Sequence, residues 1–327
     1  MSLALRMRSQ LLAGPRAPDV LSAVTRVVGV QAQATGPARL AVRARTSGLT
    51  AAHVDRACST GEVVRTWLMR GTLHMVAASD VRWMVDLLGP VFLKSGRRRR
   101  LQLGLDDALC ARSLPLFSSV LADGVPLTRA ELVERLDLGL DPKSQQPAHL
   151  IAFAALSGLI CRGPQAPGDE PTYVLLAPGS PRSDGLFELA RRYLAGYGPA
   201  TAADFAAWSG LPAADARTAF EELSVADADP PAEVPPRLVG HWDAYLLGYK
   251  SRDLVLDRSY ARKVQAGGFV QPAVLVDGRV AGTWRIDRRR LTLEPFTTLR
   301  KRDVAALRAE ADDIARFLDT SLTFAVA

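Results

Sequence analysis

Cysteine and histidine are scarce in this chain. The three cysteines are odd in number, widely spaced and without a C-x-x-C pair. The four histidines lack the spacing of metal ligands. These absences argue against a disulfide framework and against a zinc or redox centre. We therefore expect no metal and no cofactor.

Long apolar runs are also missing. No stretch approaches the ~20 consecutive apolar residues that a membrane span needs. The first residues lack the apolar centre of a secretory signal. We therefore expect a soluble cytoplasmic protein, associated with the nucleoid and without a membrane partner.

Positive charge and apolar content are what the chain does have. Lys and Arg number 41 against 34 Asp and Glu, a net charge of +7. Such a balance favours a surface that attracts a polyanion, most simply nucleic acid. Hydrophobic residues make up 48% of the 327 residues. This is ordinary globular composition, and the length allows two to four domains, each with its own core.

Three stretches share a pattern of helix, turn and second helix. In the first, apolar spacing predicts a helix over 17–28, and Thr50 caps a helix that runs to Cys58. β-Branched and aromatic residues over 63–76, interrupted at Arg70-Gly71, then predict a two-stranded hairpin. Helices followed by a hairpin are typical of a winged helix.

The second stretch begins with a capping box, in which Thr128 is the cap and Glu131 lies three residues on. Its helix is expected to end near Gly139, where glycine supplies a left-handed C-cap. A second helix over 146–159 follows. Strands are then predicted at 159–162 and 173–176, with a polar wing at 163–171 between them.

The third stretch repeats the cap with Thr201 and Asp204, and its second helix runs from Pro212 to about Leu223. A linker rich in Asp, Pro and Ala over 226–236 then precedes a β-rich region. The elements expected beyond the linker are strands at 273–276, 280–286 and 291–293 and a last helix over 301–318.

These patterns predict an α+β protein of tandem winged-helix domains with a C-terminal β-rich, barrel-like domain. The expected domains are 1–100 with the first hairpin, 101–182, 183–236, and 237–327 with the terminal helix.

Two glutamines follow the first helix. Gly29 is expected to end that helix and leave Val30 to Gln33 extended, so Gln31 and Gln33 would point the same way. On spacing alone, solvated surface glutamines are the commoner explanation.

The glutamine triplet is one of several segments that together resemble the winged-helix DNA glycosylase family of the AlkZ and YcaQ type. The segments occur in the family's order and span nearly the whole chain. They are Gly29-Val30-Gln31-Ala32-Gln33, Arg70-Gly71-Thr72-Leu73-His74, Gly198-Pro199-Ala200-Thr201 with Asp204-Phe205 and Trp208-Ser209-Gly210-Leu211, and Trp242-Asp243-Ala244-Tyr245-Leu246-Leu247-Gly248-Tyr249 with Arg252.

The resemblance implies tandem winged helices and a C-terminal β-barrel that form a concave DNA-binding surface. It also implies hydrolysis of the N-glycosidic bond of alkylated purines, including N7-alkylguanine and crosslinks, without metal or cofactor. Its catalytic motif is Gln-x-Gln in the azinomycin-resistance branch and Gln-x-Asp in the other. Gln31 and Gln33 place this chain with the first branch and are implied to be catalytic.

Breaking a glycosidic bond places positive charge on the sugar, and enzymes acting on neutral nucleosides usually supply carboxylates. A glutamine amide does not titrate in water and can only hold a water molecule or orient other groups. That suffices for N7-alkylguanine, which is cationic and departs as a neutral base. We therefore predict a monofunctional DNA glycosylase that acts on cationic N7-alkylated purines in double-stranded DNA, in repair or self-resistance.

Two further residues have both catalytic and structural interpretations. His74 could contact the sugar-phosphate or the site water, or be a partly buried wing histidine. Asp243 could be an electrostatic group opposite the developing oxocarbenium ion. A buried, hydrogen-bonded structural carboxylate is the interpretation of Asp243 that we favour.

Arginines supply candidate contacts to DNA. A basic cluster is often only solvated surface, but on a DNA-binding protein it positions the duplex through phosphate contacts. The candidates are Arg65, Arg70, Arg97, Arg98, Arg99, Arg100 and Arg162, with further basic residues at Lys94, 288–290 and 300–302.

Aromatic residues make up only 6% of the chain, and no aromatic-rich pocket is evident. We therefore hypothesise that a bulky lesion is approached in place, with a hairpin wedge opening the groove, rather than flipped into a pocket. We expect a monomer. Two other functions stay open: a winged-helix transcriptional regulator with a palindromic site, or an inactive relative that binds damage without cleaving it.

Overall fold

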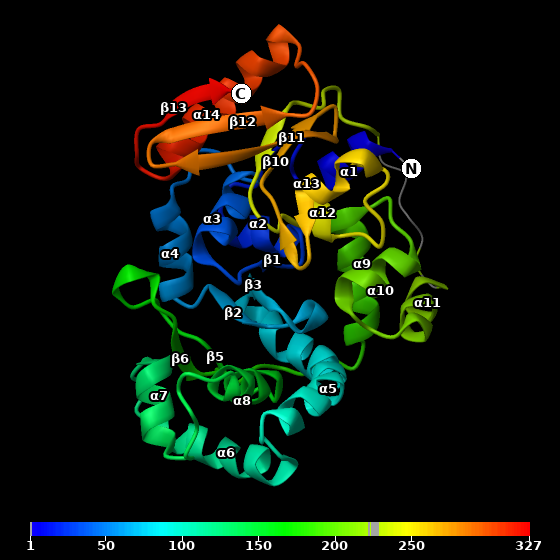
Figure 1. Ribbon diagram of the computed structural model, residues 1–327. Helices are drawn as coiled ribbons and strands as arrows, with labels where there is room; N and C mark the ends of the chain where they lie inside the picture. Colours follow the sequence, from blue (N-terminus) through cyan, green and yellow to red (C-terminus); the bar gives the residue numbers. More distant parts are fainter. Residues whose placement is uncertain (1, 222, 224–228) are drawn as a thin grey trace. The chain divides into compact units, whose positions relative to one another are not determined.

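A computed structural model describes residues 2–221, 223 and 229–327 of the chain (Figure 1). The chain contains both helices and strands, with runs of consecutive helices and of consecutive strands, which confirms the predicted α+β class. Among the described residues, no helix is both long enough and apolar enough to cross a membrane.

The described residues form two compact units, called here the first and the second unit. The first unit takes its residues from 1–54, 187–208 and 212–327, and the second from 55–186 and 209–211. The finer division into four domains stays a prediction. Of the linker predicted at 226–236, residues 226–228 lie outside the described part, and the remainder holds neither helix nor strand.

Two of the short helices at the start of the first unit begin at a side-chain cap, supplied by Ser2 and Asp19. Asp19 accepts a hydrogen bond from the backbone N–H of Ser22 over 2.7 Å, so the helix expected over 17–28 is present with tighter bounds. The elements are α1 (Leu3–Ser9), α2 (Val20–Arg26), β1 (Val30–Gln31), α3 (Thr35–Arg43) and α4 (Ala51–Ser59).

The third capping pair is confirmed. The Thr201 backbone N–H donates to Asp204 Oδ2 over 3.0 Å, and the Asp204 N–H donates to Thr201 Oγ1 over 3.2 Å. Gly210 then takes a φ of +81°, which ends the helix. The helices of this region are α9 (Gly185–Tyr197), α10 (Ala202–Ser209) and α11 (Ala213–Glu221).

A sheet in the order β13-β12-β11-β10-β7 forms the C-terminal part of the first unit. Its pairs are antiparallel except β12 with β13, which is parallel. The strands and helices of this part are β7 (Arg237–Val239), α12 (Ala244–Leu247), α13 (Ala261–Val264), β8 (Gln265–Ala266), β9 (Phe269–Val270), β10 (Ala273–Val276), β11 (Arg279–Asp287), β12 (Arg290–Pro295), α14 (Lys301–Phe317) and β13 (Thr323–Val326).

This sheet does not close into the expected β-barrel. Neighbouring residues of β10 bury their side chains on opposite faces. Val274 packs with Leu307 of α14, and Leu275 packs with Met7 of α1 and Tyr245 of α12. Because helices cover both faces, the apolar residues are buried while β7 and β13 stay at the edges. The β-rich region is therefore an open sheet between helices.

The second unit contains the predicted hairpin and the second helix pair. Its strands lie in the order β3-β2-β5-β6-β4, and Thr66 faces His74 across the hairpin. The elements are β2 (Val63–Trp67), β3 (Leu73–Ala77), α5 (Ala78–Gln102), α6 (Asp107–Val120), β4 (Leu127–Thr128), α7 (Arg129–Leu136), α8 (Gln146–Leu156), β5 (Ile160–Arg162) and β6 (Thr172–Leu175).

The capping box of α7 is present, with Thr128 and Glu131 bonded in both directions. The left-handed residue that ends α7 is Asp137, with a φ of +46°, and not Gly139. Aspartate adopts this conformation more readily than most residues because its short side chain bonds locally. Gly139 also has a positive φ but lies in the loop that follows.

Candidate active site

Gln31 and Gln33 are joined by a hydrogen bond. Gln31 Nε2 donates to Gln33 Oε1 over 3.1 Å. Val30 and Ala32 are buried, whereas Gln31 is half-buried and Gln33 is exposed. This alternation confirms the extended segment and the shared direction of the two glutamine side chains.

The backbone before the glutamines turns sharply. Val28 and Gly29 have φ values of +53° and +104°, and the Gly29 N–H donates to the carbonyl of Val24 over 2.8 Å. A β-branched residue rarely takes a positive φ, so the surrounding contacts must hold Val28 in this conformation. One such contact is the Tyr197 hydroxyl, which donates to the Val27 carbonyl over 2.9 Å.

Helix α9 packs tightly against the end of α2. A side chain at Gly196 would place its Cβ 2.2 Å from the carbonyl oxygen of Arg26, so only glycine fits this position. The end of α2, just before the segment that carries the glutamines, is therefore held by α9. A fixed backbone is what a site needs if it positions a water molecule without forming a covalent bond.

Asp243 is fully buried and forms an ion pair with Arg45. The two carboxylate oxygens accept from Arg45 Nη2 over 2.8 Å and Nη1 over 2.9 Å, and Arg45 also donates to Gln10. Burial lowers the pKa of the Arg45 guanidinium, but the charge and hydrogen bonds of Asp243 outweigh this and raise the pKa overall.

Asp243 also caps α12 by accepting from the Tyr245 N–H over 2.9 Å. The carboxylate is 0% exposed, so it cannot contact DNA directly in this structure. The structural interpretation favoured from the sequence is therefore the one that the geometry supports.

His74 lies in β3 of the second unit and is 2% exposed. Its Nδ1 is 2.9 Å from the carbonyl oxygen of Thr72. Burial, with the nearby charge of Arg70, lowers the pKa of His74 to about 3. Because a carbonyl can only accept, we assign the proton of the neutral ring to Nδ1, which leaves Nε2 as an acceptor.

The arginines of α5 differ in their surroundings. Arg97 pairs with Asp107 over 2.5 Å, and Arg99 donates to Gln145 over 2.9 Å. Arg98 is exposed. Arg100 is buried, donates to the Leu93 carbonyl over 2.8 Å and has its guanidinium 5.1 Å from the centre of the Phe153 ring. Only part of this cluster is therefore open surface.

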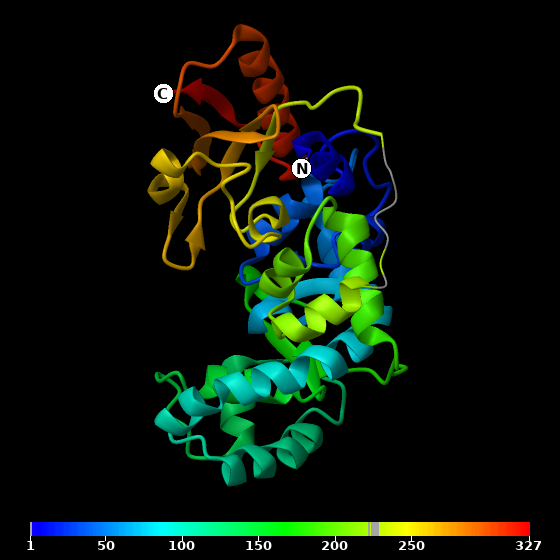
Figure 2. The ribbon, with the colours of Figure 1, turned by 90° about the vertical axis from the view of Figure 1, so that its right-hand side faces the viewer.

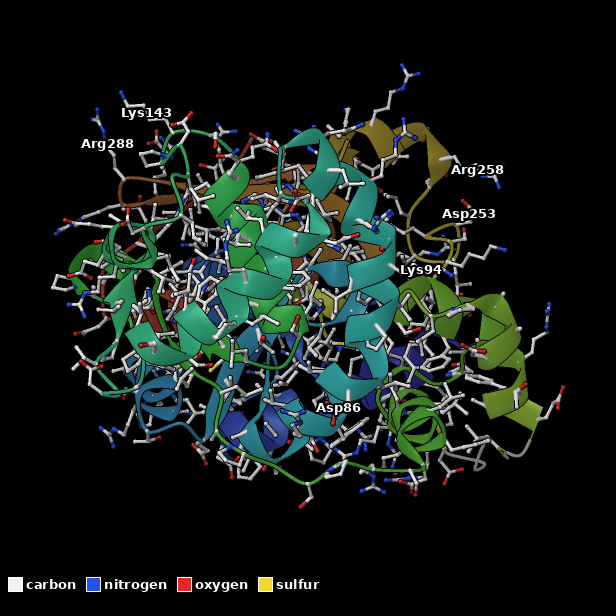
Figure 3. All side chains as sticks on the ribbon, turned by 90° about the horizontal axis from the view of Figure 1, so that it is seen from below. Asp86, Lys94, Lys143, Asp253, Arg258 and Arg288 are labelled. Atoms are coloured by element: carbon white, nitrogen blue, oxygen red, sulfur yellow. The ribbon has the colours of Figure 1, made fainter. Side chains whose placement is uncertain are left out.

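The arginines of the strands and turns lie in other settings. Arg65 is buried in β2, and its backbone lies opposite that of Arg162 in the neighbouring strand β5. Arg70 is at the hairpin turn with a φ of +56°. Arg288, in the turn between β11 and β12, extends outward from the molecule (Figure 3).

The structure shows an exposed aromatic group that the sequence analysis did not single out. Phe269 is 44% exposed and contacts the rings of His241 and Trp242, with centroids 5.0 Å and 4.8 Å away. It lies in the short β8–β9 hairpin, which extends from the first unit (Figure 2). The two glycines Gly267 and Gly268 between the strands were the signal that could have revealed it.

No group of three or more His, Cys, Asp or Glu side chains in the described part of the chain is arranged to hold a metal ion. Gln31 and Gln33 belong to the first unit and His74 to the second. The structure thus brings the two glutamines together.

The chain matches a family model over residues 24–317, and the description of that family is DNA glycosylase AlkZ-like. It belongs to the AlkZ-like DNA glycosylase family. A curated relative from Streptomyces sahachiroi, an interstrand DNA cross-link repair glycosylase, is 30% identical over 355 residues. That alignment covers 95% of this chain and 94% of the relative.

A solved structure gives the same result. The Streptomyces sahachiroi DNA glycosylase AlkZ has a TM-score of 0.83 and 26% identity, with 99% of this chain and 98% of that chain covered. Membership of the AlkZ-like family confirms the resemblance seen in the sequence and the expected class of enzyme. The alternative of a non-enzymatic regulator is not favoured, because the family is one of DNA glycosylases.

Proposed function

We propose that this AlkZ-like glycosylase hydrolyses the N-glycosidic bond of cationic N7-alkylated purines in double-stranded DNA. Its substrates would be bulky guanine adducts and interstrand crosslinks. The observation that carries the proposal is the hydrogen-bonded pair of Gln31 and Gln33. Neither side chain titrates, so the pair suits a leaving group that already carries positive charge. The relative described as a cross-link repair glycosylase supports the choice of crosslinks.

The hydrogen bond gives the two amides different roles. Gln33 Oε1 accepts from Gln31, so Gln33 presents its NH2 group as a donor to the water molecule or to the lesion. We assign to the Gln31 carbonyl oxygen the role of accepting a hydrogen bond from the attacking water. The water is then held beside the sugar as positive charge develops there. Its oxygen bonds to the anomeric carbon as the bond to the departing neutral base breaks, and its extra proton passes to bulk solvent.

The same chemistry gives selectivity. An undamaged purine would depart as an anion unless an acid protonated it, and an amide is not such an acid. N7-alkylguanine departs as a neutral base. A site built from two amides therefore accelerates loss of the damaged base and leaves normal nucleotides intact.

The helix pairs and hairpins are the basis for assigning winged-helix domains within the α+β fold. We assign α7, α8, β5 and β6 to a winged helix, because two helices precede an antiparallel pair whose connection forms the wing. The three helical stretches would then be tandem winged-helix domains, acting as a monomer on chromosomal DNA in the cytoplasm.

The β8–β9 hairpin is the best candidate for a wedge. Its exposed Phe269 is the kind of apolar side chain that opens a groove by inserting between bases. The lesion would then be approached without full rotation into a pocket. A Phe269→Ala variant should release base from duplex DNA more slowly than the parent does. From a single strand, the variant and the parent should release base at equal rates. Equal loss on both substrates would contradict the wedge.

The test of the proposed function uses a duplex with one N7-methylguanine or one bulkier N7-guanine adduct and measures released base in the presence of a chelator. Release of free base from at least one of these lesions is expected. Binding without release from every N7 lesion tried would contradict the proposal and favour an inactive damage-binding protein. A preference for an undamaged palindromic site would favour a regulator instead.

A further inference from the structure

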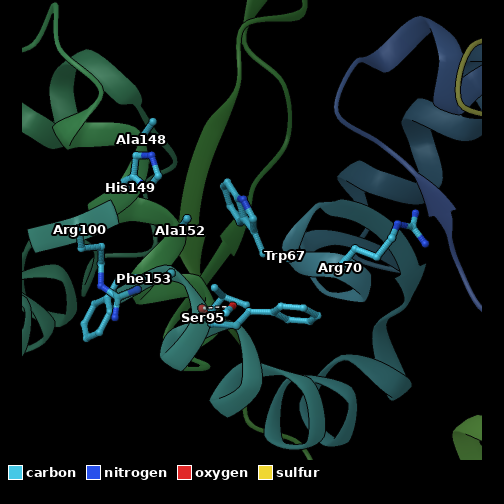
Figure 4. A pocket seen from close by; sticks show the side chains of 12 residues that line it. Trp67, Arg70, Ser95, Arg100, Ala148, His149, Ala152 and Phe153 are labelled. Carbon is cyan, nitrogen blue, oxygen red and sulfur yellow. Dashed lines mark hydrogen bonds between the residues drawn. The ribbon is translucent and has the colours of Figure 1, made fainter. Parts of the chain in front are cut away.

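Two neighbouring cavities in the second unit share one aromatic wall. The first, of about 380 Å³, lies between the hairpin turn, α5 and α8 (Figure 4). The second, of about 280 Å³, lies between β5, β6 and the starts of α7 and α8. Trp67 and Ala148 line both cavities. Because Trp67 is only half-buried, its ring stands between the cavities with surface still open.

Each cavity combines an aromatic ring with a guanidinium group. In the first, Arg100 lies over Phe153 at 5.1 Å. In the second, Arg162 lies 4.6 Å from the Tyr173 ring centre and 5.6 Å from that of Trp67. A guanidinium group at this distance over an aromatic face is attracted by the ring's electrons.

Both guanidinium groups have a buried nitrogen without a partner. Arg100 Nε and Arg162 Nη1 are shielded from solvent and donate to no acceptor among the described residues. Arg100 as a whole is 7% exposed. A buried donor left unsatisfied costs free energy, and an anion that accepted a hydrogen bond from it would relieve that cost. The pattern therefore points to an anionic ligand.

The charge lining the cavities agrees with this. Arg100 lines the first cavity, and Arg129 and Arg162 line the second. The acidic residue among those that line the two cavities is Glu170, which is exposed and lies in the second. His149, also in the first cavity, has its pKa lowered by burial and by the charges of Arg99 and Arg100. When uncharged, its ring can both donate and accept a hydrogen bond.

We propose that this pair of cavities binds an unpaired stretch of nucleic acid, with bases stacked on either side of Trp67 and phosphates at the guanidinium groups. A single strand repeats base and phosphate, as the cavities repeat aromatic ring and cation. Paired bases in a duplex already stack on each other and hide their faces, so a duplex cannot fill both cavities. This binding site is additional to the proposed base release, and either one can be present without the other.

The test measures the affinity of the full chain for a labelled strand of about eight thymidines, a length within the range that one binding module covers. Trp67→Leu should weaken this binding at least about tenfold, while affinity for a duplex changes less than about twofold. Trp67→Phe keeps a ring at this position and should retain most of the affinity. A strand of the same length without bases should bind the parent protein weakly. Its affinity should match that of the thymidine strand for Trp67→Leu.

Arginine variants test the phosphate contact. Arg162→Ala should lower the slope of log K against log salt for the single strand by about 0.7, the value for one phosphate contact on a single strand. Arg112→Ala removes an exposed arginine of α6 outside both cavities and should not change the slope. If Trp67→Leu fails to fold, the proposal is tested by the affinity of Trp67→Phe and by the salt dependence of Arg162→Ala.

Two results would overturn the proposal: equal affinity for the strands with and without bases, or the same loss on single strand and duplex in Trp67→Leu. Release of base from an alkylated duplex is measured separately. Its failure would contradict the proposed function and leave this site intact.

Discussion

Gln31 donates its side-chain N–H to the side-chain oxygen of Gln33 across 3.1 Å. The two amides form one unit on one side of an extended segment, and neither changes charge with pH. We therefore predict that the rate enhancement over spontaneous base loss, measured at the same pH, is flat between about pH 6 and pH 9. Dividing by the spontaneous rate removes the titration of the lesion itself. A bell-shaped profile would show that a titrating acid or base takes part.

His74 makes stability depend on pH. Its pKa is lowered from 6.5 to about 3, so the unfolded chain binds a proton below about pH 6.5 that the folded chain does not bind. The contribution of His74 to the free energy of unfolding is therefore fully present well above that pH and is lost as the pH falls. Between pH 6.5 and 5 the loss is about 2 kcal/mol in the free energy of unfolding.

A His74→Asn variant keeps a donor for the Thr72 carbonyl and cannot titrate. Urea unfolding at pH 7 and pH 5 should show a smaller difference for the variant than for the parent. An unchanged difference would mean that other groups account for the acid sensitivity.

Asp243 is predicted to act on stability and not on chemistry. Asp243→Asn keeps the size of the side chain but leaves the buried Arg45 charge without its counter-ion. The free energy of unfolding should fall by about 3 to 5 kcal/mol. Base release per folded molecule should stay within about twofold of the parent. A loss of two orders of magnitude in rate, roughly the size of an electrostatic catalytic contribution, without loss of stability would contradict this assignment.

Arg98 is predicted to contact a DNA phosphate. It is exposed on α5, whereas its neighbour Arg97 is paired with Asp107. Arg98→Ala should lower the slope of log K against log salt for duplex DNA by about 0.9. Arg97→Ala should lower it less, and Arg112→Ala should leave it unchanged. Equal effects of all three variants would indicate only a general loss of charge.

Local patterns were enough to predict much of the fold. The caps at Thr128 and Thr201 involve residues three apart, so their hydrogen bonds can be read from sequence alone. The hairpin over 63–76 is also local, because its turn falls between strands that pair with each other. The extended glutamine segment was predictable because Gly29 marks the turn after the preceding helix, although that helix ends earlier, at Arg26.

Contacts between distant residues were not predictable. Arg45 and Asp243 are 198 positions apart, and no spacing rule pairs them. Strand β13 pairs in parallel with β12 only after α14 has crossed the sheet. The 25-residue helix α5 contains Pro90 and has apolar residues spread around its circumference, so its pattern did not indicate a helix.

The functional sites were also predictable only where they depend on neighbouring residues in the sequence. The glutamine pair is local and was expected, whereas the cavities beside Trp67 depend on how β2, α5 and α8 pack. A low aromatic content did not reveal that Trp67, Phe92 and Phe153 converge on one cavity, because convergence is a property of tertiary structure.

Gln31 and Gln33 are predicted to carry the chemistry. The direct measurement is single-turnover release of N7-methylguanine from a duplex by the parent, Gln31→Ala and Gln33→Ala, with duplex affinity measured alongside. We predict that each variant loses about two to three orders of magnitude in rate and keeps duplex affinity within about twofold. Release at the parental rate by both variants would contradict the account.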